Sequence, residues 1–201
     1  MKKKILFVLI IVITSIAVNA QNIIWQDDFD GNKRWSEFEY KKEGSCLVKD
    51  GMLTIKSEDG YSFISNCKTN LNGNKNFTLK IEATSKSGLK EDIFFGIVLN
   101  YLDRKNYTLF AVEKGFAYFM EFKQGVIVRQ EYDLIKKTKE KTFSLEVQKS
   151  GNNILFVVNG EETLDMEQVE VTSGKIGLYV SGKAEVSFDN LKILQYFCLY
   201  K

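Results

Sequence analysis

The 201-residue sequence contains no histidine and no proline, and it has only three cysteines. Without histidine, the chain by itself cannot form a His-based catalytic triad, a His-ligated zinc site or an imidazole acid–base pair. No glycine- and serine-rich linker interrupts the chain, so its composition marks no second domain. Cys46, Cys67 and Cys198 are an odd number, which leaves at least one thiol without a partner in the chain.

The obvious disulfide, Cys46–Cys67, conflicts with the pattern of the residues between the two cysteines. Turn signals at Asp50-Gly51 and Asp59-Gly60 divide residues 46–67 into three short strands, which predicts a three-strand meander. Alternate strands of one sheet lie roughly 9–10 Å apart, whereas a disulfide needs Cα atoms within about 7 Å. We therefore do not expect this bridge. Either cysteine could instead pair with Cys198, and the sequence leaves that choice open.

The first twenty residues have the three parts of a secretory signal peptide. Lys2, Lys3 and Lys4 precede an uncharged apolar run, and Val18 and Ala20 supply small residues before a cleavage point at Gln21. The apolar run is shorter than the roughly 20 residues needed to span a bilayer. We predict a signal peptide at residues 1–20, a single domain at 21–201, an extracytoplasmic location (periplasmic or secreted) and no stable membrane insertion after cleavage.

The charge of the mature chain is close to zero. Without residues 1–20, the chain holds 25 basic and 26 acidic residues, and its basic residues do not cluster. Because nucleic acids and anionic membranes are recognised through concentrated positive charge, we expect neither as a partner.

Most segments alternate apolar and polar residues with a period of two. In "FTLKIEAT" (77–84) and "FSLEVQK" (143–149), the apolar residues share one face and the polar residues share the other. Glycine-containing turn signals separate these segments, among them Asn72-Gly73, Asn159-Gly160 and Ser181-Gly182. Short alternating segments at regular spacing predict an all-β fold, either a sandwich or a barrel.

Three central segments, 93–101, 107–112 and 116–122, are apolar on both faces. One face of each predicted strand packs on the core, so the other must be covered by loops or a partner, or must form an aromatic groove that binds a ligand. The candidate ligand-binding residues on these strands are Tyr101, Tyr107, Tyr118, Asn100 and Glu121.

Four motifs, in order, resemble those of secreted concanavalin A-like, laminin-G-like domains. They are "DDFDGNKRW" (27–35), "GMLTIKS" (51–57), "FFGIVLNYLDRKNYTLFAVEKG" (94–115) and the closing stretch from "FSLEVQKSGNNILFVVNGEE" to "GKIGLYVSGKAEVSFDNLKI" (143–193). The resemblance implies a jelly-roll sandwich of two antiparallel sheets whose first and last strands pair. Relatives of this fold include lectins, adhesion modules, family 16 glycoside hydrolases and 3-keto-disaccharide hydrolase domains, so the fold does not choose a function.

The catalytic motif of family 16 hydrolases, E-x-D-x-E on one strand, does not occur in this sequence. Retaining hydrolysis needs two carboxylates about 5–5.5 Å apart, and the absence of that motif argues against this activity. We therefore predict a secreted, non-catalytic carbohydrate-binding β-sandwich with a glycan as its partner. One alternative is a carbohydrate-active enzyme that uses two acids among Glu113, Glu121, Glu131 and Asp133. The other is a structural or protein-interaction module of the cell envelope.

The acidic opening "DDFDGNKRWSEFE" nearly matches an EF-hand loop, but Lys33 stands where the sharp turn requires glycine. A looser structural calcium site remains a hypothesis, with Asp30 and Asp189 as ligands if the first and last strands pair. The simpler interpretation is that Asp28 or Asp30 caps a turn of its own backbone.

Overall fold

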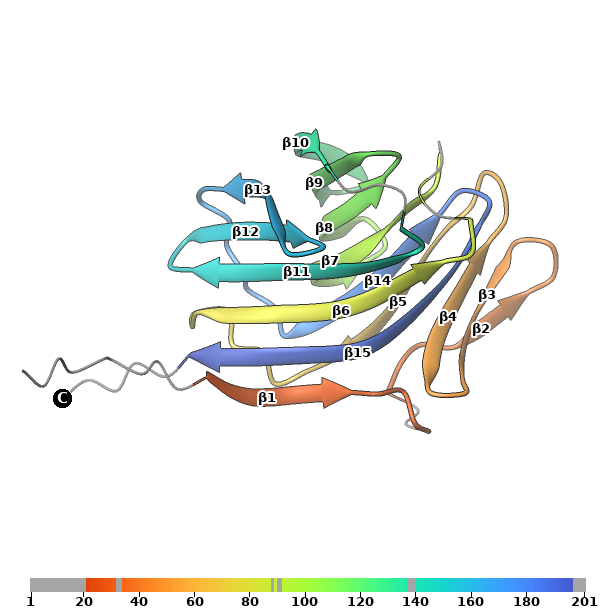
Figure 1. Ribbon diagram of the computed structural model, residues 1–201, viewed down its shortest axis with the longest axis horizontal. Coiled ribbons are helices and arrows are strands. Elements are labelled where there is room, and N and C mark those ends of the chain that lie inside the picture. Colours follow the sequence, from red (N-terminus) through yellow and green to blue (C-terminus); the bar gives the residue numbers. More distant parts are fainter. Residues whose placement is uncertain (1–20, 32–33, 88, 90–91, 137–139, 197–201) are drawn as a thin grey trace, which may run out of the picture.

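The computed structural model describes residues 21–31, 34–87, 89, 92–136 and 140–196. These residues form fifteen strands in two antiparallel sheets, which confirms the all-β sandwich. Figure 1 shows the two sheets as stacked layers, with long β6, β11 and β15 side by side in the front layer. Among the described residues, no helix is long and apolar enough to cross a membrane.

The larger sheet has nine strands. In spatial order they are β13 (Glu161–Met166), β12 (Asn153–Val158), β11 (Thr142–Ser150), β6 (Phe77–Ser85), β15 (Ala184–Tyr196), β4 (Met52–Ser57), β3 (Gly44–Lys49) and β2 (Phe38–Tyr40), with β1 (Gln21–Asp27) also paired to β15. The smaller sheet has six, in the order β10 (Val126–Leu134), β9 (Phe116–Lys123), β8 (Asn106–Glu113), β7 (Phe94–Asp103), β14 (Lys175–Ser181) and β5 (Ser62–Lys68).

The last strand, β15, pairs with the first strand, β1. Its residues 191–196 pair with β1, from Asp27 opposite Leu191 to Gln21 opposite Tyr196, as the resemblance predicted. A bulge after Asp189, where Asn190 has a φ of 56°, shifts the alternation of the strand by one residue. Phe188 and Leu191 therefore both face the core.

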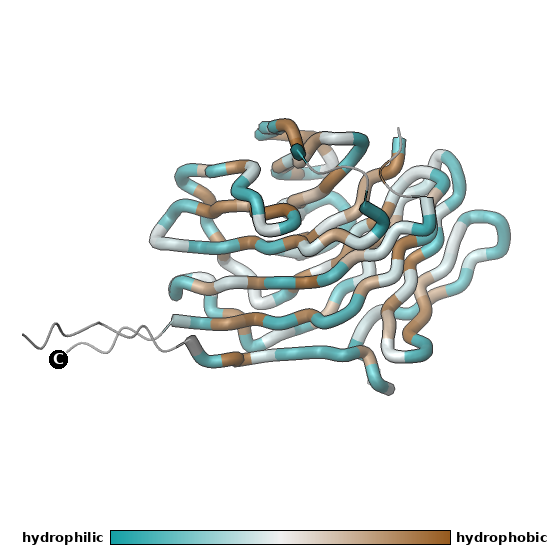
Figure 2. The backbone as a smooth tube through the Cα atoms, in the orientation of Figure 1, coloured by the Kyte–Doolittle hydropathy of each residue, from teal (hydrophilic) through white to brown (hydrophobic). Residues whose placement is uncertain are grey.

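The core lies between the two sheets and is rich in phenylalanine. Phe95 and Phe110 of the six-stranded sheet meet Phe143 and Phe156 of the nine-stranded sheet, with ring centroids 5.6 Å apart in both pairs. Figure 2 shows the alternation of apolar and polar residues along the strands that places one set in this core. The burial of these rings removes a large apolar surface from water and so stabilises the sandwich.

The predicted meander at residues 46–67 is wrong. The β3–β4 hairpin lies in the nine-stranded sheet, but the turn at Asp59-Gly60 sends β5 across to the six-stranded sheet, where it pairs with β14. Cys46 and Cys67 are both buried in the core and both are free thiols. The expected absence of a bridge between them is correct, but the reason is different, since the two strands belong to opposite sheets. Cys198 lies outside the described residues.

Candidate functional site

A second apolar cluster covers the outer face of the six-stranded sheet, which points away from the core. Val98, Tyr107, Leu109, Ala111 and Met120 form its buried part, and partly buried aromatic rings surround them: Phe94, Tyr101, Tyr118, Phe122 and Tyr179. The prediction that the central strands are apolar on both faces is therefore confirmed. Loops of the described chain do not bury these rings completely, so part of this face remains available to a ligand.

At Asn100, the alternation of side chains between the two faces of β7 shifts by one residue. This residue has a φ of 53°, and the pairing of β7 with β8 loses its regular register between Leu99 and Asp103. The resulting irregularity moves Tyr101 onto the outer face, whereas strict alternation from buried Leu99 would place it on the core side. The side chain of Asn100 holds the 170–173 segment instead: its Nδ2 donates to Glu170 O at 2.7 Å, and its Oδ1 accepts from Thr172 N at 2.8 Å.

A cavity of about 270 Å³ lies between β2, β5 and the turn that joins β7 to β8. We call it the tyrosine pocket, because Tyr40, Tyr101, Tyr107 and Tyr179 all line it. Phe38 and Phe63 complete its aromatic wall, with ring centroids 4.9 Å apart. Burial raises the pKa of Tyr107, and the neighbouring hydroxyls of Tyr179 and Tyr101 raise it further. Tyr107 therefore presents a neutral hydroxyl that can both donate and accept hydrogen bonds.

Polar side chains at the rim of the tyrosine pocket include Arg104, Glu37, Asn66 and Ser36. Arg104 sits in a braced turn, since Asp103 Oδ1 accepts from Lys105 N at 2.7 Å and from Asn106 Nδ2 at 2.9 Å. Glu37 is held in place by β3, because its Oε1 accepts a hydrogen bond from Val48 N at 3.2 Å. The pocket thus combines ring faces with one guanidinium, carried by a turn that Asp103 braces, and one carboxylate that accepts a hydrogen bond from the backbone.

A larger, more open groove of about 710 Å³ adjoins this pocket. Tyr107 lines both hollows, and in the groove it stacks on Phe122 with ring centroids 4.5 Å apart. Asn100 and Glu121 also line the groove, so the structure brings these two predicted residues together with Tyr107. We call this second hollow the end groove.

Tyr118 belongs to a separate aromatic group. Its ring centroid lies 5.1 Å from that of Phe94 and 5.8 Å from that of Tyr132. Burial, followed by the nearby carboxylate of Glu113, raises the pKa of Tyr118. The predicted set thus divides into Tyr101 and Tyr107 in the tyrosine pocket, Asn100 and Glu121 in the end groove, and Tyr118 apart from both.

The four acids considered for catalysis do not gather in either hollow. Glu121 lines the end groove, where the second acid is Glu170, and Lys123 Nζ lies 2.8 Å from Glu121 Oε1. Glu131 instead pairs with Arg129 at 3.1 Å, and Glu113 Oε1 accepts from Asp92 N. The predicted pairing of two of these four acids is therefore not found in these hollows.

The proposed calcium ligands lie on different elements. Asp30 lies against Gly51 in the β3–β4 turn, and Asp189 Oδ1 accepts from its neighbour Asn190 N at 2.6 Å. The part of the chain that the structure describes contains no group of three His, Cys, Asp or Glu residues placed to hold a metal ion. A calcium ion at these aspartates would therefore depend on backbone carbonyls and water for most of its ligands. Asp28 does cap its own turn, accepting from Asp30 N at 3.3 Å.

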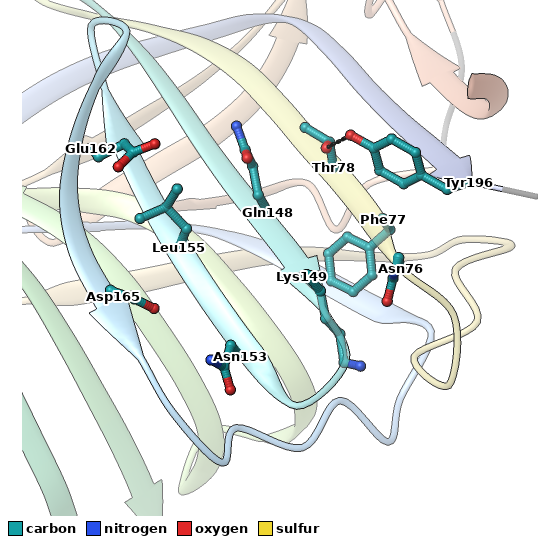
Figure 3. Close-up of a pocket in the computed structure, with 11 residues that line it drawn as sticks. Asn76, Phe77, Thr78, Gln148, Lys149, Asn153, Leu155, Glu162, Asp165 and Tyr196 are labelled. Atoms are coloured by element: carbon teal, nitrogen blue, oxygen red, sulfur yellow. Dashed lines mark hydrogen bonds between the residues drawn. The ribbon is translucent and has the colours of Figure 1, made fainter. Parts of the chain in front are cut away.

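Another cavity, of about 490 Å³, lies over β6, β11, β12 and β13 of the nine-stranded sheet (Figure 3). Tyr196 is its single tyrosine, and its hydroxyl lies 3.1 Å from Thr78 Oγ1. Glu162 and Asp165 add two carboxylates on the side of β13. At the other end, Lys149 donates to Gly151 O, and burial lowers the pKa of its amine. With one tyrosine among its lining residues, against four in the tyrosine pocket, this cavity is the weaker candidate for stacking on a sugar ring.

A family model of the 3-keto-alpha-glucoside-1,2-lyase-like domain matches residues 24–194. The chain belongs to this family. The match covers both sheets and every residue of the tyrosine pocket and the end groove. Family membership relates the sandwich to carbohydrate chemistry, but it does not distinguish binding from catalysis.

Solved structures of the same fold include binding and catalytic proteins. Carbohydrate-binding module CBM66 from Bacillus subtilis superposes with a TM-score of 0.59 and 17% identity, covering 80% of this chain and 94% of that one. The catalytic domain of an endo-1,3-beta-glucanase (laminarinase) from Thermotoga petrophila gives 0.60 and 10%, covering 90% and 100%. An endo-beta-1,3-glucanase from Pyrococcus furiosus gives 0.62 and 9%, covering 88% and 95%. At these identities the likeness concerns the jelly-roll fold. No curated protein matches the chain.

The sequence reasoning missed Arg104, Tyr179 and Tyr40 as pocket residues. Tyr179 lies two residues after Gly177 in "GKIGLYV" on β14. Its neighbour Leu178 is buried, and this alternation was a usable signal that the ring of Tyr179 faces outward. Arg104 and Tyr40 come from a turn and a three-residue strand. These two residues come close to β5 and β8 because the chain passes from one sheet to the other, and local sequence patterns do not encode that path.

Proposed function

We propose that the protein is an extracytoplasmic, non-catalytic module that binds a glycan in the tyrosine pocket and along the adjoining end groove. The observation that carries the proposal is the convergence of four tyrosines with Arg104, Glu37 and Asn66 around one cavity. Aromatic rings offer flat apolar faces to the C–H side of a sugar ring, and the polar groups can bond its hydroxyls. A signal peptide at residues 1–20 would deliver such a module outside the cytoplasm.

Tyr107 lines both the tyrosine pocket and the end groove, and this position favours a binding site for more than one sugar residue. One unit would occupy the tyrosine pocket, and the next would continue into the end groove towards Phe122 and Glu121. The family relation to carbohydrate chemistry and the likeness of the fold to a carbohydrate-binding module support this assignment.

The test is a glycan array followed by affinity gel electrophoresis on the polysaccharides that bind. Tyr40→Ala and Arg104→Ala alter exposed pocket groups, so they should leave the fold intact and weaken binding at least fivefold, the usual effect of losing an anchoring contact. Tyr101→Ala should act in the same direction. Tyr118→Ala is the matched control, because Tyr118 lies in the separate aromatic group. Unchanged retention of folded Tyr40→Ala and Arg104→Ala proteins would refute the assignment.

An elimination reaction on a 3-keto glycoside is the second candidate, favoured by the family match and by the presence of Glu37 and Arg104 in the same pocket. A ketone at C3 acidifies the proton on C2, which Glu37 would accept as general base. The C2–H electrons would form the C1=C2 bond, and the leaving oxygen would depart with the C1–O electrons and take a proton from water. Arg104 would stabilise the negative charge that develops on the ketone oxygen.

A 3-keto-α-glucoside is the probe for this reaction, and the ultraviolet absorbance of the unsaturated ketone is the readout. If the reaction occurs, Glu37→Gln should abolish product formation but retain binding of the substrate. Absence of product with the wild-type protein, under conditions in which it binds the same compound, would reject catalysis and leave the binding function standing.

A further inference from the structure

Among the described strands, β10 lies at one edge of the six-stranded sheet, and it is unusually apolar for such a position. It is nine residues long, and its exposed side chains include Val126, Val128, Tyr132 and Leu134, which keep 63%, 51%, 63% and 64% of their surface accessible. Edge strands of monomeric proteins are usually short, charged or interrupted, because an open row of N–H and C=O groups pairs readily with another strand. A long apolar edge therefore suggests that another strand covers it.

The edges of the nine-stranded sheet are protected in the usual ways. At one end, β13 has three acidic residues among its six, and at the other end β2 is only three residues long. The bulge of β10 lies between Ile127 and Arg129, near the start of the strand. From Arg129 to Leu134 the pairing with β9 is regular, so the backbone there has the geometry that a further strand needs.

The sequence of β10 is complementary to itself in one antiparallel register. If Gln130 faces Gln130 of a second copy, Arg129 faces Glu131 of that copy, and Glu131 faces its Arg129. In the same register, Tyr132 faces Val128, so an aromatic ring also meets a β-branched side chain. Opposite charges and aromatic–β-branched pairs at directly opposed positions are the contacts that stabilise neighbouring strands.

Neighbouring registers lose this complementarity. A shift that centres the pair on Glu131 places two identical carboxylates opposite each other, and one that centres it on Arg129 does the same with two guanidinium groups. Within one chain Arg129 Nη2 already lies 3.1 Å from Glu131 Oε1. In the register centred on Gln130, the Arg129–Glu131 pair of each copy would lie beside that of the other. The four side chains would then alternate in charge.

We propose that two copies of this chain associate through β10, forming one continuous antiparallel sheet across a two-fold axis at Gln130. A second copy is the occupant because the charge pattern of the edge is matched by the edge itself. The proposal does not depend on glycan binding, and its tests measure mass and cross-linking in the absence of carbohydrate.

Charge exchange between the two copies is the sharpest test. Arg129→Glu and Glu131→Arg each place like charges opposite each other, so each variant should dimerise at least tenfold more weakly than the wild type in sedimentation equilibrium. An equimolar mixture of the two variants restores opposite charges at both positions, and it should form a mixed dimer. The double variant Arg129→Glu/Glu131→Arg should also dimerise. Circular dichroism verifies that each variant is folded, since Arg129 Nη1 also donates to Glu167 O.

Cross-linking tests the register. Directly opposed residues of antiparallel strands have Cα atoms about 4.5–5.5 Å apart, a separation that a disulfide spans. In a Cys198→Ser background, Gln130→Cys should form a disulfide-linked dimer under mild oxidation, and Asp133→Cys, which lies three positions from the two-fold axis, should not. A wild-type protein that remains monomeric at its highest soluble concentration, or a mixture of the charge variants that stays monomeric, would overturn the proposal.

Discussion

The indole Nε1 of Trp35 donates a hydrogen bond to Asp27 Oδ2 at 3.1 Å, inside the protein. The other oxygen of the same carboxylate accepts from Phe29 N at 2.9 Å. Phe29 has a φ of 57° and packs on Trp35, with ring centroids 5.6 Å apart. The dense acids of "DDFDGNKRW" thus include one buried aspartate whose observed role is structural: it folds the segment after β1 back onto the core.

Replacing Asp27 with Asn should destabilise the protein by roughly 1–3 kcal/mol. The amide can accept only through its oxygen, so its NH₂ group would face one of the two buried donors and leave that donor unpaired. Urea denaturation measures the loss. Asp28→Asn is the control, since Asp28 is exposed, and it should change stability by less than about 0.5 kcal/mol. Equal effects of the two substitutions would contradict the assigned role of Asp27.

Asn100 combines a left-handed backbone with hydrogen bonds to the 170–173 segment. Asn100→Gly keeps the backbone conformation but removes the hydrogen bonds, which should cost roughly 1–3 kcal/mol. Asn100→Ala should cost about 1 kcal/mol more, because alanine is strained at positive φ. Denaturant unfolding of both variants separates the two effects. If the alanine variant proves as stable as the glycine variant, backbone strain is not part of the role of this residue.

The buried thiols predict a loss of stability at alkaline pH. Burial raises the pKa of Cys46 from 9.0 to about 11, and burial together with the Asp27 carboxylate raises that of Cys67 to about 12. Well below pH 9 both thiols are neutral in the folded chain and in the unfolded chain, so their ionisation does not reduce the stability of the fold there. As the pH rises from 9 towards 11–12, only the unfolded chain ionises, and the folded state loses stability.

At pH 10 this loss should be about 1 kcal/mol for each thiol relative to pH 8. The measurement is urea unfolding at the two pH values, with Cys198 replaced by Ser throughout. A variant in which Cys46 and Cys67 are both alanine is the control for other alkaline groups, such as Tyr107. A wild-type loss no larger than that of the control would show that these thiols do not contribute.

Gly177 allows β5, β14 and β7 to pack closely behind the tyrosine pocket. A Cβ at this position would lie 2.9 Å from Ile64 Cγ2 and 3.2 Å from Val98 Cβ. Gly177→Ala should therefore cost roughly 1–3 kcal/mol through overpacking and weaken glycan binding by displacing the neighbouring Tyr179. Adding Ile64→Ala should recover part of the binding, as measured by affinity gel electrophoresis. Undiminished stability of Gly177→Ala would show that the sheet absorbs the added methyl group.

Local patterns in the sequence were enough to establish the strands and most of their faces. Alternation in 77–84 and 143–149 predicted which residues enter the core, and the step from Phe188 to Leu191 corresponds to the bulge in β15. These features are local because side-chain direction in a strand follows a period of two, and a bulge shifts that period visibly in the sequence. The doubly apolar segments likewise predicted that the six-stranded sheet has a second apolar face.

The position of the candidate site depended on contacts between distant parts of the chain. The sequence could not show that β5 leaves the β3–β4 hairpin for the opposite sheet, because the Asp59-Gly60 turn is compatible with either path. It also could not show that the bulge at Asn100 moves Tyr101 to the outer face, because the partners of Asn100 lie some seventy residues away. Amino-acid pattern established the strands, whereas long-range pairing brought Tyr40, Arg104, Tyr107 and Tyr179 around one pocket.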